Sequence, residues 1–547
     1  GWSKLYDYAS FLEDQNDYIN AIEVAENLRW YYSAPGRKVD EYDLGRLYNL
    51  LGMLYKAQNK PDKAEKYYLS AIEIREHLVK KNADAYEPDL AGSYNNAGIF
   101  YKKQGQPDKA EEYYLDAIGI YERLVKKNAD AYEPALAGIY NNAGNFYSDH
   151  NHSKKAEKYY LAAIEIHERL VEKNADAFEP ALADSYNNAG VFYKKQGQSE
   201  KAEKYYLAAI EIYERLVEKN TDAYEPDLAM SYNNAGVFYS DHGQPEKAEK
   251  YYLAAIEIRE RLVKKNADAY EPDLATSYNN VGAFYDDQNQ PDKAEKYYIA
   301  AIGIYERLVE KNADAYEPYL ATSYNNAGVF YDDQNQPEKA EKYYLAAIEI
   351  RERLVEKNAD AYEPDLAGSY NNAGVFYSDH GQSDKAEKYY LAAIEIRERL
   401  VKKNAYAYEP YLADSYNNAG NFYSDHNHSK EAEKYYLDAM EIYERLTEKN
   451  AAAYEPDLAG SYNNAGIFYK KQGQPDKAEK YYLAAIEIRE RLVKKNAAAY
   501  EPDLATLYYN YYLLKKDKTY LDKAYEIAKR RQDDPRCRYI VEFVESH

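Results

Sequence analysis

The sequence has a single cysteine, Cys537, among its 547 residues. One cysteine excludes an intramolecular disulfide framework and any metal site built from several cysteines, and it fits a reducing compartment, so we expect a cytoplasmic location. No apolar run approaches the roughly 18 residues that indicate a transmembrane helix. No signal-peptide pattern opens the chain. The chain begins Gly1-Trp2 without Met, which is compatible with a processed or partial polypeptide whose upstream domain is missing.

Basic residues and phenylalanine are also scarce. The 71 Lys and Arg residues are outnumbered by 94 Asp and Glu residues, which gives a formal net charge of -23. A sequence-independent hold on nucleic acid or on an anionic membrane needs an excess of Lys and Arg, so we expect neither as a partner. Phe occurs 12 times against 69 Tyr. The apolar surface therefore consists mostly of rings that need a hydrogen-bond partner or water, which predicts a thin core close to solvent.

A block reading SYNNAG begins at Ser93 and recurs with a constant spacing of 46 residues. Its first Asn stands at positions 95, 141, 187, 233, 279, 325, 371, 417 and 463. Weaker copies extend the register in both directions, which gives about twelve units. A fixed period of roughly 20 to 50 residues is typical of solenoids and arrays. We therefore expect each unit to bury its apolar face only against its neighbours.

The unit at residues 86–131 contains two stretches of helical periodicity. Pro88 predicts a helix start, since proline is favoured in the first turn. Apolar residues then follow at spacings of four, three and four up to Tyr101. The pattern breaks at 105–107, and a second helix runs on to Asn128. Two antiparallel helices in each of about twelve units predict an all-α fold with roughly 24 helices and no sheet.

Small and aromatic residues in this unit carry a family resemblance. Gly98, Tyr101, Ala110, Tyr114 and Ala117 fall at the offsets that define tetratricopeptide repeats. The sequence therefore resembles that family over nearly its whole length, although the period is twelve residues longer than the usual 34 of the family. The resemblance implies a right-handed superhelical solenoid of about twelve helix pairs that binds a protein or peptide.

Two finer resemblances concern the length of the unit and its linker. Long units with an Asn-Asn pair look like those of kinesin light chains. The linker KNADAYEPDLA resembles repeat arrays attached to bacterial signalling NTPases of the STAND class and to caspase-like or CHAT proteases. These resemblances imply the ligand-sensing part of a larger bacterial signalling or defence protein. We expect an N-terminal capping repeat at 1–40, a tandem array at 41–505 and a degenerate capping repeat with a tail at 506–547.

Comparison of the nine close copies divides the first helix into two faces. The face of Leu90 and Tyr101 hardly changes from copy to copy, as packing requires. The positions of Asp89, Gly92 and Ile99 vary, with Asn96 constant among them, and their spacing places them on one opposite stripe. The family resemblance makes this stripe the wall of a concave groove.

The constant Asn of this stripe is the first candidate for ligand contact. An Asn amide supplies both a donor and an acceptor, which suits the backbone of an extended peptide. A similar row of asparagines is known in the repeat domain of O-GlcNAc transferase. In the alternative interpretation, Asn ties adjacent helices together or the copies have merely drifted. The candidates are Asn96, Asn142, Asn188, Asn234, Asn280, Asn326, Asn372, Asn418 and Asn464, together with Tyr319 and Tyr411 at the position of Asp89.

The carboxyl end of the stripe carries a pattern of charge. Lysine pairs in the outer units flank an acidic middle formed by Asp286, Asp287, Asp332 and Asp333. Solvation alone accounts for most surface charge. If the charges have a function, the middle units should prefer a basic segment of the partner.

Catalytic and metal-binding motifs are missing from the sequence. No phosphate-binding glycine loop, HExxH helix or GxSxG elbow occurs. His150-Asn151-His152 lies in a turn without a further ligand nearby, so we expect a neutral turn variant. We therefore predict a non-catalytic protein- or peptide-binding module without cofactor or metal. The alternative is a structural scaffold or self-associating adaptor that has no dedicated ligand in its groove.

Overall fold

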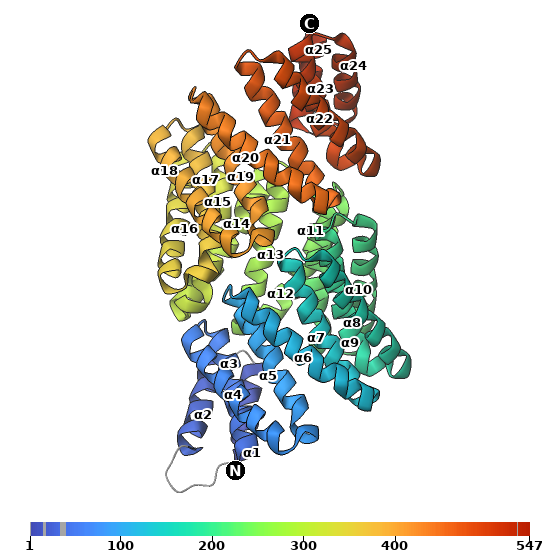
Figure 1. Cartoon of the computed structure of the whole chain (residues 1–547), viewed down its shortest axis with the longest axis vertical. Helices are drawn as coiled ribbons and strands as arrows, with labels where there is room; N and C mark the ends of the chain where they lie inside the picture. Colours follow the sequence, from blue (N-terminus) through green and yellow to red (C-terminus); the bar gives the residue numbers. More distant parts are fainter. Residues whose placement is uncertain (1, 15–17, 33–39, 533, 547) are drawn as a thin grey trace. The chain divides into compact units, whose positions relative to one another are not determined.

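The structure is a computed structural model of the chain, and it describes residues 2–14, 18–32, 40–532 and 534–546. Within these ranges the chain is a succession of α-helices without a strand (Figure 1). The helices are α1 (Trp2–Asp14), α2 (Tyr18–Tyr32), α3 (Glu41–Ala57), α4 (Pro61–Lys81), α5 (Ala83–Lys103), α6 (Pro107–Lys127), α7 (Ala129–Asp149), α8 (Ser153–Lys173), α9 (Ala175–Lys195), α10 (Ser199–Lys219), α11 (Thr221–Asp241), α12 (Pro245–Lys265), α13 (Ala267–Asp287), α14 (Pro291–Lys311), α15 (Ala313–Asp333), α16 (Pro337–Lys357), α17 (Ala359–Asp379), α18 (Ser383–Lys403), α19 (Ala405–Asp425), α20 (Ser429–Lys449), α21 (Ala451–Lys471), α22 (Pro475–Lys495), α23 (Ala497–Lys515), α24 (Lys518–Arg530) and α25 (Pro535–Ser546). The predicted all-α class is confirmed, and the described residues contain one helix more than the expected 24 because α25 follows the last pair.

The period of 46 residues follows directly from the helix bounds. Helices α5 and α6 each contain 21 residues, the turn between them takes residues 104–106, and the single residue Asn128 separates α6 from α7. Three turn residues and one linker residue complete the period. At about 1.5 Å per residue, each of these helices is about 31 Å long.

The first helix of each unit begins earlier than the sequence predicted. Helix α5 starts at Ala83, and Pro88 lies inside it. Asn82 caps the helix, because its side-chain oxygen accepts a hydrogen bond from the backbone N–H of Ala85 at 3.3 Å. Such a cap stabilises a helix by roughly 1 kcal/mol, while Pro88 removes only one backbone bond near the helix start. The prediction that the proline opens the helix was therefore wrong.

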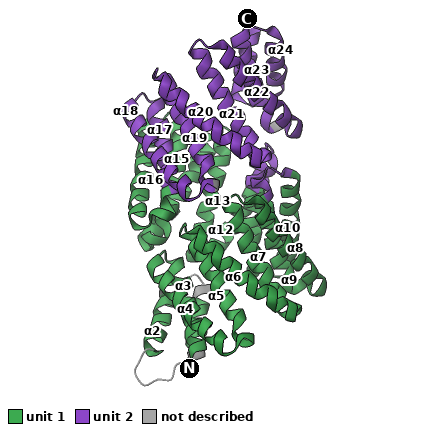
Figure 2. Ribbon diagram, viewed as in Figure 1, with its two compact units in different colours: residues 1–192, 200–235, 251–363 green, residues 193–199, 236–250, 364–547 purple. Residues whose placement is uncertain are grey.

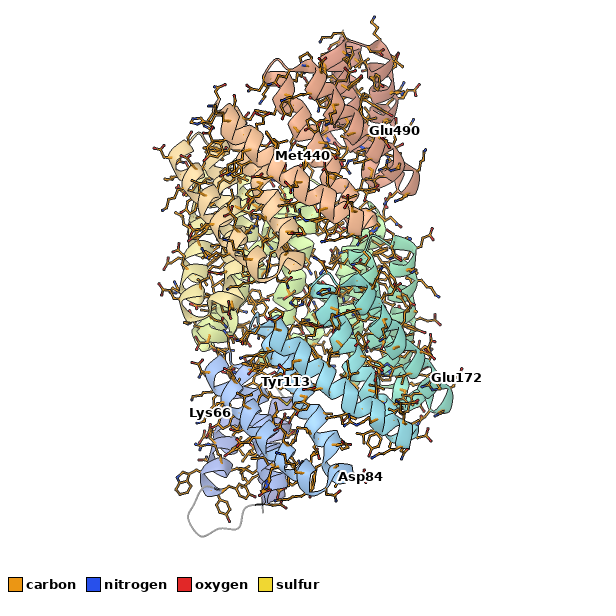
Figure 3. The ribbon with its side chains drawn as sticks, viewed as in Figure 1. Lys66, Asp84, Tyr113, Glu172, Met440 and Glu490 are labelled. Carbon is orange, nitrogen blue, oxygen red and sulfur yellow. The ribbon has the colours of Figure 1, made fainter. Side chains whose placement is uncertain are left out.

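Tyrosine rings and small residues form the core as predicted. Ala97, Ala110 and Ala117 are completely buried, and Tyr114 is 1% exposed. The ring of Tyr101 has the polar partner that the sequence predicted for such rings, because its hydroxyl donates to Glu65 at 2.8 Å. The same ring stacks on Tyr113, with ring centroids 5.5 Å apart; Tyr113 is labelled in Figure 3.

The described helices form two compact units (Figure 2). Unit 1 comprises residues 1–192, 200–235 and 251–363, and unit 2 comprises residues 193–199, 236–250 and 364–547. Both units are interrupted in sequence, so short turns pack with helices that are remote along the chain. The predicted boundaries near residues 40 and 505, which separate the capping repeats from the tandem array, stay predictions.

Contacts between remote repeats occur inside each unit. In unit 1, the side chain of Asn312 donates to Gln58 at 2.7 Å and that of Asn358 donates to Gln104 at 2.6 Å. In unit 2, Asn450 donates to Gln196 at 2.8 Å. Each pair is 254 residues apart, or about five and a half periods. The expectation that a repeat contacts only its sequence neighbours was wrong, because the array returns upon itself.

Candidate functional site

The second Asn of each repeat links neighbouring first helices. Each of the nine candidate asparagines is half-buried. In five of these repeats, the amide nitrogen of this Asn donates a hydrogen bond to the side-chain oxygen of the first Asn in the preceding repeat. These bonds are Asn96 to Asn49 at 3.2 Å, Asn142 to Asn95 at 3.0 Å, Asn234 to Asn187 at 3.2 Å, Asn280 to Asn233 at 3.2 Å and Asn418 to Asn371 at 3.3 Å. The row therefore has a structural role.

The row of Asn–Asn bonds is interrupted at regular intervals. Asn188, Asn326 and Asn464 make no side-chain hydrogen bond to another described residue. In the repeat before each of them, the amide nitrogen of the first Asn donates a hydrogen bond to a serine hydroxyl of the next repeat instead. These bonds are Asn141 to Ser185 at 2.7 Å, Asn279 to Ser323 at 2.7 Å and Asn417 to Ser461 at 2.6 Å. The buried side-chain oxygens of these three asparagines have no partner among the described residues.

The variable position of Gly92 is coupled to the second helix of the same repeat. Asp184 accepts a short hydrogen bond from Tyr213, and Asp414 accepts one from Tyr443. In two other repeats a hydroxyl takes this place: Thr276 lies 2.8 Å from Tyr305, and Thr322 accepts from Arg351 at 3.1 Å.

Sequence reasoning missed these second-helix partners because only first helices were compared. The signal was present, since the position of Tyr121 reads Tyr, His or Arg in successive copies. The position of Ile99 also contacts the second helix of its repeat. Asn145 and Asn421 stand at this position in two other repeats; Tyr160 donates to Asn145 at 2.6 Å, and Tyr436 donates to Asn421 at 2.7 Å. Part of the variation in the stripe therefore reflects packing inside each repeat.

Tyr319 and Tyr411, both predicted as ligand contacts, remain accessible. They are 51% and 56% exposed, respectively. Tyr319 stacks on Tyr305 with centroids 5.8 Å apart, and the guanidinium carbon of Arg397 lies 5.9 Å from the centre of the Tyr411 ring. One face of each ring is therefore supported by the second helix of the preceding repeat.

A cleft of about 490 Å³ in unit 2 brings several of these positions together. It is lined by Asn371, Asn372, Arg397, Asp414, Asn417, Asn418, Tyr443, Pro456, Asp457, Gly460, Ser461, Asn464 and Arg489. The candidates Asn372, Asn418 and Asn464 thus share one concave surface. Burial and the neighbouring charge of Asp414 raise the pKa of Asp457 to about 6. The lining therefore carries carboxylates, guanidinium groups and amides side by side.

The acidic middle of the array lies at the carboxyl ends of α13 and α15. Burial, followed by the charges of Asp333 and Asp287, raises the pKa of Asp286 to about 6. Burial also raises the pKa of Asp333. In outer repeats, by contrast, lysine and aspartate of neighbouring repeats form ion pairs: Lys102 with Asp149 at 2.6 Å, Lys194 with Asp241 at 2.6 Å and Lys471 with Asp425 at 2.7 Å. One lysine of each outer lysine pair is thus neutralised by an aspartate of a neighbouring repeat.

The histidine turn has a local structural role. A ring nitrogen of His150 lies 2.7 Å from the carbonyl oxygen of Phe146, and the two rings are in contact. Across the described residues, no group of three or more His, Cys, Asp or Glu side chains could hold a metal ion. None of the described helices is both long and apolar enough to cross a membrane.

Family models described as tetratricopeptide repeat match most of the chain. The matches cover residues 45–77, 90–128, 136–174, 181–353, 365–445 and 458–496. The chain therefore belongs to the tetratricopeptide repeat family, a class of protein-binding repeat modules, and the predicted family is confirmed. A comparison with curated protein sequences gives no match.

Several solved structures are similar in fold. BtubC (BKLC) from P. vanneervenii is 25% identical, with 45% of this chain and 92% of that chain covered and a TM-score of 0.37. A Rap protein complexed with Competence and Sporulation Factor is 15% identical, with 74% and 99% covered and a TM-score of 0.45. Yeast Tom70 is 14% identical, with 97% and 99% covered and a TM-score of 0.41.

Proposed function

We propose that this chain is a non-catalytic module that captures an extended peptide segment of a partner protein along the first helices of its repeats. The observation that carries the proposal is the cleft of unit 2, where groove asparagines, two aspartates and two arginines line one concave surface. Concave sites with a few convergent polar groups are the usual places for ligand binding.

The asparagines in the cleft do not all have the same role. Asn418 is committed to its neighbour, because it donates to Asn371. Asn464 makes no such bond within the described part of the chain, and it also lines the cleft. Its amide can therefore pair with both an N–H and a carbonyl group of a peptide backbone. Within the cleft, we therefore propose Asn464 as the asparagine that makes the main contact with the peptide backbone.

Further candidate contacts lie outside the cleft, and each belongs to one unit: Tyr411 lies in unit 2, while Tyr319 and the acidic middle lie in unit 1. Tyr319 and Tyr411 offer aromatic surface of a kind that is enriched at protein interfaces. Asp286, Asp287, Asp332 and Asp333 favour a basic segment of the ligand and should act mainly on its rate of association. The linker resemblance supports a bacterial, cytoplasmic sensor whose effector or NTPase domain lies upstream on the same polypeptide.

A peptide selection tests the proposal. Random peptides displayed in a library would be selected on the full chain, and the affinity of the selected peptides would then be measured for two variants. Asn464→Ala removes an amide from the cleft, while Asn188→Ala removes an equivalent amide at another interruption of the row, outside the cleft. We expect about two- to tenfold weaker binding for Asn464→Ala and unchanged binding for Asn188→Ala. Equal affinities, or no selected peptide at all, would contradict the proposal.

A further inference from the structure

Two edges of the repeats meet where the array returns upon itself. One, the cap edge, consists of the Asn residues that cap the first helices. The other, the turn edge, consists of the Gln and the next residue in the turn between the two helices of a repeat. In each pairing the cap Asn keeps its own helix capped through its oxygen and donates through its nitrogen: Asn312 accepts from Ala315 at 3.3 Å and donates to Gln58 at 2.7 Å.

The backbone of the turn edge is shaped for this contact. Asn59, in the left-handed region with a φ of 51°, donates to the carbonyl oxygen of Asp314 at 2.7 Å. Glycine takes the same place in two further pairings. A Cβ on Gly105 would lie 2.5 Å from the carbonyl oxygen of Asp360, and one on Gly197 would lie 2.6 Å from that of Ala452. Cap edge and turn edge therefore fit closely in both compact units.

Each edge also has members that the chain itself does not cover. Cap residues near the amino end are exposed, whereas those from Asn266 onward are half-buried. The exposed members of the cap edge are Asn82, Asn128, Asn174 and Asn220; Asp84, labelled in Figure 3, follows the first of them. None of these four asparagines donates to a turn Gln among the described residues, in contrast to Asn312, Asn358 and Asn450.

The turn edge is also open in later repeats. Gln288-Asn289 and Gln334-Asn335 have the same residues as Gln58-Asn59, and both of their asparagines have a φ of 54°. No cap Asn of the described residues donates to Gln288 or Gln334, as Asn312 does to Gln58. Gly473 shows the same opening in unit 2: its φ is 67°, and no heavy atom lies within 4 Å of a Cβ built there.

We propose that a second copy of this chain docks on these open edges, with its cap edge on the turn edge of the first copy. The contact repeats the one that the chain makes with itself, in which three Asn–Gln pairs of identical separation already occur. Because the two edges are different surfaces, the association is heterologous and can continue into longer assemblies. This proposal is independent of the groove and its ligand.

Charge sets the conditions for docking. The formal net charge of -23 makes two copies repel each other at low ionic strength. Along the cap edge, the charge is compensated locally, since Asp130 pairs with Lys173 at 2.6 Å and Asp176 with Lys219 at 2.8 Å. Salt therefore screens the long-range repulsion more than it weakens the contact, and association should become stronger as salt is added.

Sedimentation of the full chain over a range of concentrations tests the proposal. The wild-type protein is expected to show a mass that rises with concentration, and more steeply with added salt. Asn128→Asp with Asn174→Asp keeps both caps, because Asp is also a good cap residue, but removes the two donors. The matched control is Gly119→Glu with Gly303→Glu, which adds the same charge at open positions where sister repeats have Glu. The cap-edge variant should associate at least about tenfold more weakly than the control.

A mixing experiment distinguishes this mode from other self-association. Gln288→Ala with Gln334→Ala damages the turn edge and leaves the cap edge intact. Each variant alone should associate at least about tenfold more weakly than the control. An equal mixture of the two should form dimers, and nothing larger, at concentrations where neither variant associates alone, since only one intact edge of each kind remains. A wild-type mass that stays monomeric at all concentrations, or variants that associate like the control, would overturn the proposal.

Discussion

The side chain of Asn358 donates a 2.6 Å hydrogen bond to Gln104, which lies 254 residues earlier in the chain. The two backbones also approach closely beside this bond, because there is no room for a Cβ at Gly105 against the carbonyl oxygen of Asp360. Repeats that are remote in sequence are thus held together inside unit 1, and their stability should depend on this contact.

Replacement of Gly105 tests that dependence. Gly105→Ala introduces a Cβ 2.5 Å from a carbonyl oxygen, while Gly473→Ala introduces one into open space at nearly the same φ, 67° against 66°. Both variants carry the backbone strain of the left-handed region, so only the first has the additional clash. We expect Gly105→Ala to unfold with about 1–3 kcal/mol less stability than Gly473→Ala in chemical denaturation. Equal losses would show that the remote contact does not form in solution.

Gly98 gives a corresponding test of packing within a repeat. A Cβ at Gly98 would lie 2.9 Å from Tyr114, and the ring is buried on all sides, so Gly98→Ala should cost about 1–3 kcal/mol. Gly92 lies in the same helix with open space around it, and Gly92→Ala should instead stabilise the helix by about 0.5–1 kcal/mol. Thermal unfolding followed by circular dichroism would compare them, and shifts of the same sign would contradict the packing described.

The interrupted asparagine row predicts opposite effects for two neighbouring alanine variants. Asn418→Ala removes the bond to Asn371, which is worth about 0.5–1.5 kcal/mol. Asn464→Ala removes no bond to a described residue and gains a few tenths of a kcal/mol, roughly, in helix propensity. Denaturant melts should therefore rank Asn464→Ala above wild type and Asn418→Ala below it. The reverse order would show that Asn464, and not Asn418, makes a stabilising side-chain hydrogen bond.

The groove aspartates should make the protein more stable at mildly acidic pH. Burial, with a neighbouring aspartate, raises the pKa of Asp227 and of Asp457 to about 6 from an ordinary value of 3.8. The folded state then binds more protons than the unfolded state between about pH 4 and 6, so these groups lower the free energy of unfolding as the pH rises through that window. Asp227→Asn with Asp457→Asn should reduce the difference in melting temperature between about pH 5 and about pH 7. An unchanged difference would contradict the raised pKa values.

His167 should act in the opposite direction. It is 3% exposed, a ring nitrogen lies 2.8 Å from the hydroxyl of Ser185, and burial lowers its pKa to about 4. The unfolded state then binds the extra proton, so the stability that this neutral ring provides is lost as the pH falls from about 6.5 to 4. His167→Tyr, with the residue that sister repeats use, should flatten the acid side of a melting-temperature profile. An equally steep profile in this variant would count against the lowered pKa.

The repeat sequence by itself determined the period, the two helices of each repeat and the packing face. Gly98, Ala110 and Tyr114 recur at fixed offsets, and such short-range patterns dictate local packing in every copy. The true start of the first helix at Ala83 was also readable, because Asn82 is a favoured cap residue, but the more conspicuous Pro88 led to a later start.

Only the tertiary structure decided which groove side chains are committed to the protein itself. Nothing within one repeat indicates that Asn418 bonds to Asn371 while Asn464 does not bond to Asn417, because the difference depends on how each amide turns between two neighbouring helices. The pairing of Asn358 with Gln104 was equally hidden. Small rotations between successive repeats add up over about five and a half periods, and no local sequence pattern records that sum.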